Sequence, residues 1–198
     1  MFNRKYKIPI ASDNYLNIYD KCDIGCFFCK FNRCVNQVSL NVINYDDYVN
    51  QKVLVSYSTD PYPYIYRNEV VPEVIGRLHK NNCSVVFLTR RAECLIKDLK
   101  IFNQGDYVGL SISENNDKNS TIENNTLLFQ LAKNAGIKTW ISLEPVVTFS
   151  FVREMLDIYQ DKVDFIRIGK NDLEINCNWK NICEQVKKLN FDNVFIKE

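Results

Sequence analysis

Long apolar segments are missing from this 198-residue chain. No apolar run approaches the roughly 20 residues that a membrane-spanning helix needs. The first fifteen residues hold Arg4, Lys5 and Lys7 and lack the apolar core of a signal peptide. We therefore expect a cytoplasmic protein with no membrane partner.

An excess of charge of one sign is also missing. Lys and Arg together number 25 and Asp and Glu 24, which gives a net charge of +1. This balance creates no long-range field that attracts nucleic acid or anionic lipid. Any such partner must be held by local contacts.

Histidine is scarce, whereas cysteine is abundant. His79 is the only histidine, and it falls late in a predicted helix on its polar side, which predicts a surface position and argues against histidine-based catalysis. Of the eight cysteines, three are clustered, and five are scattered without the pairing pattern of a secreted disulfide scaffold. This usage favours a reducing compartment.

The clustered cysteines form the most specific motif of the sequence. Cys22, Cys26 and Cys29 have the spacing C-x3-C-x2-C and follow an alternating run over residues 15–19 that predicts a strand. Gly25 lets the backbone turn between the first two cysteines. Three thiolates can surround one soft metal centre, and the absence of a fourth at matching spacing leaves one coordination position open.

Beyond this loop, predicted strands and helices alternate. Extended patterns cover residues 53–57, 84–88, 107–112, 138–143, 163–168 and 194–196. Amphipathic helical patterns cover residues 70–80, 92–102, 127–135, 152–159 and 179–189. Short strands joined by helices imply parallel pairing through right-handed crossovers. Because an eight-unit barrel takes about 250 residues, we expect one α/β domain over residues 1–198, a partial (β/α)6 TIM-like barrel open on one side.

Two helix starts carry capping signals. Ser120 followed by Glu123 is a capping-box signature for a helix whose predicted apolar face holds Leu127, Leu128, Leu131 and Ala135. Ser150 is the expected cap of the next helix.

Polar residues gather where the predicted strands end, which is where parallel barrels bind ligands. In strand order these candidates are Ser58, Thr59 and Asp60, then Thr89 and Arg90, then Ser111 and Ser113, then Ser142 and Glu144. Each has a structural alternative. Asp60 before Pro61 equally fits a simple turn, and for Ser111, Ser113 and Ser142 packing or capping is favoured over a ligand role.

The cysteine spacing, with the aromatic Phe28 before the last cysteine, resembles the cluster loop of radical S-adenosylmethionine (SAM) enzymes. The resemblance implies that Cys22, Cys26 and Cys29 hold three irons of a [4Fe-4S] cluster and that SAM chelates the fourth. It also implies that Phe28 lies against the adenine, and that the fold is a six-unit partial barrel. A zinc knuckle is the alternative, although zinc sites usually pair two C-x2-C units.

Four later motifs narrow the resemblance to the spore photoproduct lyase group. They are Ser-Thr-Asp-Pro-Tyr, Leu-Thr-Arg, Val-Gly-Leu-Ser-Ile-Ser and Ser-Leu-Glu-Pro, which follow or lie in successive strands. By this resemblance Thr59 or Asp60 receives the SAM amine, Arg90 the carboxylate, and Ser111 or Ser142 the ribose. Ser58 and Ser113 complete the cofactor-binding candidates.

The resemblance implies a radical SAM enzyme of lyase or oxidoreductase type. A reductant such as flavodoxin or ferredoxin would reduce the cluster, and SAM would yield a 5'-deoxyadenosyl radical that abstracts hydrogen from an unidentified small molecule, peptide or nucleic acid. Cys177, after the sixth strand, is a candidate hydrogen-atom donor, and Glu144 is a candidate functional carboxylate.

Two alternatives stay open. Repair of a DNA lesion is disfavoured because the chain is shorter than the lyases, lacks an evident basic surface, and has Tyr57 where the lyases carry a thiol. A non-catalytic zinc or iron–sulfur module is the other.

Overall fold

The computed structural model describes residues 12–26, 28–29, 39–56, 58–64, 70–114, 119–170 and 177–197. These residues contain a seven-stranded sheet whose strands are all parallel and pair in sequence order from β1 to β7. The strands are β1 Asn14–Leu16, β2 Lys52–Val55, β3 Ser84–Thr89, β4 Tyr107–Ile112, β5 Lys138–Val146, β6 Phe165–Lys170 and β7 Val194–Ile196. The sheet is open because β1 and β7 are its two edges.

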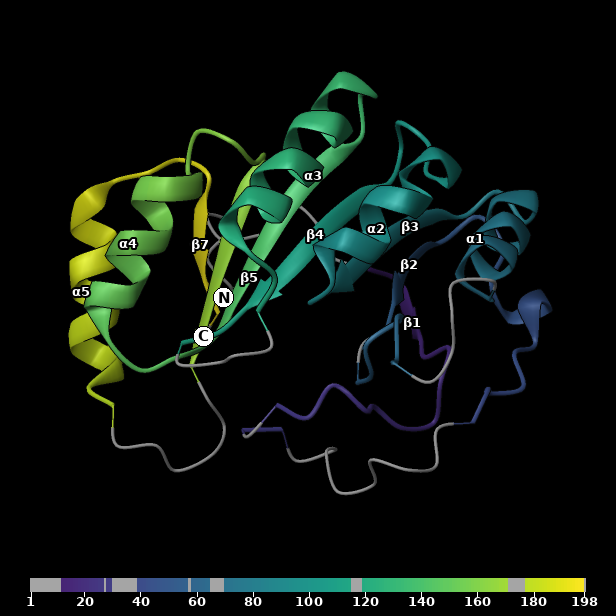
Figure 1. Cartoon of the computed structure of the whole chain (residues 1–198), viewed down its shortest axis with the longest axis horizontal. Helices are drawn as coiled ribbons and strands as arrows, with labels where there is room; N and C mark the ends of the chain where they lie inside the picture. The colour runs from purple at the N-terminus through teal and green to yellow at the C-terminus, as the bar shows by residue number, and fades with distance from the viewer. Residues whose placement is uncertain are drawn as a thin grey trace, which may run out of the picture.

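Five α-helices connect the later strands. They are α1 Val70–Lys80, α2 Ala92–Asp98, α3 Ile122–Asn134, α4 Phe149–Tyr159 and α5 Trp179–Leu189, with 3-10 turns at Tyr45–Asp47 and Leu99–Ile101. Figure 1 shows the helices arranged along one face of the curved sheet. The predicted α/β partial barrel, open on one side, is thereby confirmed.

The two faces of the sheet carry different side chains. One face packs under the helices: Val53, Phe87 and Ile141 from the strands share a core with Ile75 and Leu156 from α1 and α4. Strand side chains alternate between faces, so the neighbouring residues form a second apolar cluster on the opposite face. That cluster contains Val86, Tyr107, Trp140 and Phe165, with Leu54, Leu88 and Phe195 packed against it. We call this opposite face the inner face.

An aromatic layer covers the inner face toward the amino ends of the strands. The Trp140 ring stacks on Phe165 with ring centroids 5.7 Å apart, and its Nε1 donates to the Phe87 carbonyl oxygen at 3.2 Å. A Cβ atom at Gly109 would lie 2.3 Å from Trp140 Nε1, so only glycine leaves room for the indole. Residues two positions further along these strands therefore face the open end of the barrel.

The helix starts differ from the predicted ones. Thr121, not Ser120, caps α3, since its Oγ1 accepts from Asn124 N at 3.2 Å. Ser120 Oγ instead donates to Glu93 Oε2 at 3.2 Å. Thr148, not Ser150, caps α4 by accepting from Phe151 N. In both cases a threonine with extended backbone stands directly before the helix, which is the geometry that a cap needs.

The apolar face of α3 is also shifted from the prediction. Leu128 is buried, but Leu127 and Leu131 are 45% and 37% exposed and Ala135 is exposed as well. Phe129 and Ala132 are buried in their place. The prediction of His79 as a surface residue is wrong as well. Its side chain is 17% exposed, and its Nε2 lies 2.8 Å from Oδ2 of the buried Asp106. Among the described residues, no helix has the length and apolar character to cross a membrane.

Candidate functional site

The cysteine loop follows β1 and packs against the loop after β2. Cys26 is buried, whereas Cys22 and Cys29 are partly buried. Cys29 N donates to Cys26 O at 3.0 Å, and Asp60 N donates to Cys22 Sγ at 3.5 Å. Burial raises the pKa of the Cys22 thiol to about 11, against the opposing effect of the Asp60 and Ile24 amides. Without a metal this thiol is protonated at neutral pH.

The three sulfurs do not form a metal-ligand group in this arrangement. Among the residues that the structure describes, no group of three or more Cys, His, Asp or Glu side chains is placed to hold a metal ion. Binding of an iron–sulfur cluster by Cys22, Cys26 and Cys29 therefore stays a prediction from the sequence.

Asp60 joins the loop after β2 to the end of β3. Its Oδ1 accepts from Thr89 Oγ1 at 2.8 Å and from Tyr62 N at 2.9 Å, and its Oδ2 accepts from Arg90 N at 2.8 Å. Burial raises the pKa of this carboxyl, and the hydrogen bonds from Arg90, Tyr62 and Thr89 partly offset that rise. The bond from Tyr62 N, two residues on, is the turn that the sequence offered as the alternative role of Asp60.

Arg90 connects three separate segments at the carboxyl edge of the sheet. Its guanidinium carbon lies 5.1 Å from the centroid of the Phe28 ring, in the cysteine loop. Its Nη1 donates to Ser113 Oγ at 2.9 Å and to Asn119 Oδ1 at 3.0 Å, both beyond β4. Arg90 is only 8% exposed and Ser113 is fully buried. Asp60, Arg90, Phe28 and Ser113, all predicted candidates, are thus in one contiguous cluster.

Asn119 belongs to this cluster and was missed from the sequence. Its Nδ2 donates to Ser113 O at 2.7 Å, while its Oδ1 accepts from Ser113 N at 3.2 Å as well as from Arg90. The only available signal was an amide side chain in the polar run after β4. That run contains several asparagines, and nothing local distinguishes this one.

The other residues after β2 tie this loop to β1. Ser58 N donates to Asn17 Oδ1 at 2.9 Å, and Thr59 Oγ1 donates to Tyr19 O at 3.3 Å. Ser56, just before them, has a left-handed backbone with a φ of 68°. Its Oγ is buried and has no hydrogen-bond partner among the described residues. Tyr57, predicted to stand at the thiol position of the lyases, lies outside the described residues.

The remaining candidates lie in β4, β5 and the segment before α5. Ser111 and Ser142 are adjacent in register on β4 and β5, on the inner face and beyond the aromatic layer. Glu144 Oε1 lies 2.7 Å from Lys197 Nζ, and Oε2 lies 3.8 Å from Arg167 Nη2. Cys177 is partly buried at the start of α5, where Trp179 N donates to its carbonyl oxygen at 2.9 Å.

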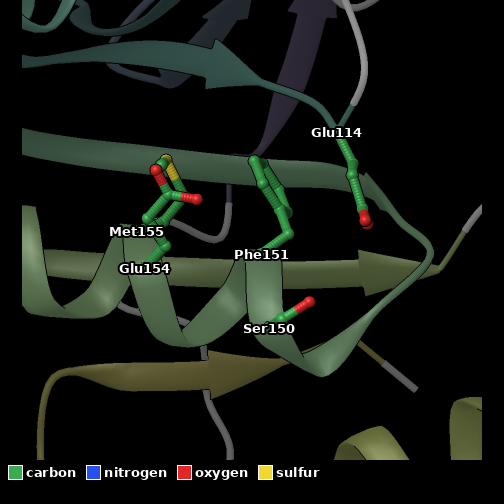
Figure 2. A pocket seen from close by; sticks show the side chains of 5 residues that line it. All are labelled: Glu114, Ser150, Phe151, Glu154 and Met155. Atoms are coloured by element: carbon green, nitrogen blue, oxygen red, sulfur yellow. The ribbon is translucent and has the colours of Figure 1, made fainter.

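A shallow hollow of about 340 Å³ lies beside α4, away from the inner face. Figure 2 shows Phe151, Glu154 and Met155 rising from α4 on one side and Glu114 from the end of β4 on the other. The Glu114 carboxylate is already committed, because it accepts from Val147 N and Thr148 N, each at 2.8 Å, and from Thr148 Oγ1. This hollow contains none of the predicted site residues.

The open parallel sheet in sequence order, with helices between its strands, is a TIM-like α/β fold. Solved structures of spore photoproduct lyase, a radical SAM enzyme, resemble this structure. A cysteine-to-serine mutant of the lyase matches with a TM-score of 0.63 at 9% identity, over 92% of this chain and 75% of that one. A tyrosine-to-phenylalanine mutant matches with a TM-score of 0.59 at 10% identity, over 96% and 75%.

A third lyase structure contains bound AdoMet and dinucleoside spore photoproduct. It matches with a TM-score of 0.56 at 13% identity, over 86% of this chain and 59% of that one. At such identities the likeness shows the fold alone. No protein-family model matches the sequence, and no curated protein is significantly similar to it.

Proposed function

We propose that this protein is a radical SAM enzyme that holds a [4Fe-4S] cluster through Cys22, Cys26 and Cys29 and takes hydrogen from its substrate by means of SAM. The observation that carries the proposal is the position of Arg90. A buried guanidinium at the carboxyl edge of the sheet contacts the aromatic residue of the cysteine loop and is anchored to the end of β4. The fold likeness to spore photoproduct lyase supports the same class of enzyme.

The residues present fit the two cofactors by their chemistry. Three thiols in one loop are the soft ligands that iron–sulfur clusters take, and a bound metal would lower the high pKa of Cys22. The buried hydroxyl of Ser56 has no partner among the described residues and lies at the edge where SAM would bind. Arg90 supplies the fixed cation that the SAM carboxylate needs.

Each remaining SAM contact has a proposed residue. Asp60 accepts three hydrogen bonds, and a carboxylate has about four acceptor sites, so one is left for the SAM amine, beside Thr59 and Ser58. Ser111 and Ser142 would bind the ribose from the inner face, and Ser113 would keep the Arg90 guanidinium in position. Phe28, held against Arg90, would pack on the adenine.

When bound, the reduced cluster supplies the electron that cleaves SAM to methionine and a 5'-deoxyadenosyl radical. The part of the protein is to orient SAM and to exclude water. Flavodoxin or ferredoxin would serve as reductant. Cys177 stays a candidate hydrogen-atom donor for the product.

The test is anaerobic reconstitution with iron and sulfide, followed by incubation with SAM and dithionite. The wild type should bind about four irons per chain and form 5'-deoxyadenosine, whereas Cys26→Ala should do neither. Cys83→Ala is the matched control, because Cys83 is a buried cysteine whose Sγ donates to Tyr48 O, far along the sequence from the loop. Zinc without iron in the purified wild type would instead establish a structural metal module.

Lesion repair is the second candidate function, because one matching lyase structure is complexed with dinucleoside spore photoproduct. Incubating the reconstituted protein with that dinucleoside, SAM and dithionite tests it directly. Formation of two thymidines from each dinucleoside would establish repair, and 5'-deoxyadenosine without thymidine would point to another substrate.

A further inference from the structure

A charged cluster lies on the inner face, beyond the aromatic layer. Two residues after Trp140 and Phe165 come Ser142 and Arg167, which are adjacent in register on β5 and β6. Glu144 follows on β5, and Lys197 directly follows β7. Alternation along the strands and the ion pairs of Glu144 place these side chains on the face that the helices do not cover.

The charges in this cluster do not balance. Glu144 lies between Lys197 Nζ at 2.7 Å and Arg167 Nη2 at 3.8 Å, so among the described residues two cations share one carboxylate and one positive charge is left over. The side chains of Arg167, Glu144 and Lys197 are 24%, 26% and 39% exposed, respectively. Half-buried charge without a full counter-charge costs free energy. Folding alone does not explain why it is there.

Arg167 has unused hydrogen-bonding capacity. Its Nε is buried and has no hydrogen-bond partner among the residues that the structure describes. The long distance to Glu144 leaves the guanidinium fork available to another acceptor. A guanidinium fork matches the two oxygens of a carboxylate or phosphate group.

Glu144 packs closely against Gly169 in the neighbouring strand β6. A Cβ atom at Gly169 would lie 2.8 Å from Glu144 Cδ and 2.9 Å from its Oε2. Any larger residue at position 169 would therefore displace the Glu144 carboxylate from between the two cations. Glu144, which the sequence marked as a candidate functional carboxylate, is thus placed to hold Arg167 and Lys197.

We propose that Arg167 and Lys197, held by Glu144, bind a single carboxylate group of the substrate, which is a small molecule or peptide. One excess positive charge suits a monoanion. A nucleic acid would bind through many phosphates, and the net charge of +1 supplies no further basic surface for them. The identity of this anion as the substrate rests on the proposed function, whereas the anion site itself does not.

Binding of benzoate to the full chain tests the site. Its dissociation constant, measured by ligand-observed NMR, should rise about tenfold or more in Arg167→Gln. Arg167→Lys should give a smaller rise, because it keeps the charge and loses the fork. Arg153→Gln is the matched control. Arg153 pairs with Asp157 on the exposed side of α4, and its loss should leave binding unchanged.

Labelling with phenylglyoxal gives a second readout at residue level. Benzoate should protect Arg167 from modification, as followed by mass spectrometry, and should leave Arg153 reactive. The dinucleotide TpT, used as competitor, separates the sources of the anion. The proposal fails if benzoate does not bind, if Arg167→Gln binds it as well as the wild type does, or if TpT displaces it at lower concentration than benzoate binds.

The Cys26→Ala variant separates this proposal from the proposed function. It should lose the cluster and still bind benzoate with the affinity of the wild type. If the wild type binds benzoate through Arg167 but never forms 5'-deoxyadenosine, only the radical SAM proposal is wrong. If it forms 5'-deoxyadenosine but Arg167→Gln does not weaken benzoate binding, only the anion site is wrong.

Discussion

Two aspartates, the buried Asp106 and the partly buried Asp60, lie at opposite ends of the sheet and have different partners. Asp106 stands before β4, where its Oδ1 accepts from Val85 N at 2.7 Å, and its Oδ2 accepts from Asn103 N at 2.7 Å and lies beside His79. Asp60 stands beyond β2 at the other end and also accepts three hydrogen bonds. Both carboxylates hold neighbouring segments together.

The difference lies in what these aspartates fix in place. The partners of Asp106 are two backbone amides and the histidine ring, and this cluster ends there among the described residues. Asp60 fixes Arg90, whose guanidinium continues to Phe28 in the cysteine loop and to Ser113. In parallel barrels the amino ends of strands serve stability and the carboxyl ends serve ligands. We expect the two aspartates to follow that division, so substitutions at the two ends should have separable effects.

The largest expected effect is on stability at the amino end. Asp106→Ala leaves two amides and His79 without their acceptor in a site where Asp106 is 1% exposed. The free energy of unfolding should fall by about 3 kcal/mol or more, as measured by urea denaturation. Asp157→Ala, which breaks an exposed pair with Arg153, should cost less than about 1 kcal/mol. Equal losses in the two variants would contradict the structural role of Asp106.

At the carboxyl end, the expected effect is on activity. Arg90→Gln should lower the rate of 5'-deoxyadenosine formation about 100-fold, because the proposed charge-assisted hydrogen bond to SAM would be lost. Arg91→Gln is the neighbouring control. Arg91 turns away to Glu93 and to the Tyr64 ring, so its variant should stay within about twofold of the wild type. A stability loss in Arg90→Gln without a rate defect per folded molecule would contradict the comparison.

The third prediction concerns the acidity of the cysteine loop. In the metal-free protein, alkylation of Cys22 by iodoacetamide should rise with a midpoint near pH 11, because burial raises the pKa of this thiol to about 11 from 9.0. In urea the midpoint should return to about 9.0. Since the folded protein favours the neutral thiol, its contribution to stability is present below pH 9 and is lost as the pH rises toward 11. A midpoint near 9 in the folded protein would contradict the burial of Cys22.

The smallest expected effect is on the stability of α3, whose first residues lie outside the contacts of Asp60 and Asp106. Thr121→Ala should lower the free energy of unfolding by about 1 kcal/mol, because Thr121 caps α3. Ser120→Ala should cost less, since that hydroxyl bonds only to Glu93 among the described residues. Thermal melts followed by circular dichroism measure both, and a larger loss in Ser120→Ala would restore the cap expected from the sequence.

The fold was predictable where one periodicity dominates. The bounds of α1, β4 and β7 agree with the sequence prediction, because apolar spacing in these segments matches one kind of element and polar residues bound them. The buried face of α3 was not predictable in this way, because Leu127, Leu128, Phe129 and Leu131 all lie within about one turn. The contact of Phe129 with Tyr159, and not the local pattern, determines which side is buried.

The candidate site was predictable in part for the same reason. Topology brings the strand ends together, so Asp60, Arg90 and Ser113 could be grouped before their contacts were known. Asn119 could not, because its contribution depends on how the loop after β4 folds back onto Ser113. Arg167 and Lys197 were missed because a strand arginine and a lysine near the chain end carry no local sign that Glu144 lies between them.

The stack of Trp140 on Phe165 limits how deep a molecule can enter the barrel. Glu144 lies four residues beyond Trp140 on the same strand, which corresponds to about 13 Å of extended chain. A substrate of the proposed enzyme would therefore rest on this aromatic layer and present its reacting carbon toward the carboxyl ends of the strands. Compact molecules, or the projecting end of a longer one, would suit such a site better than a polymer lying along it.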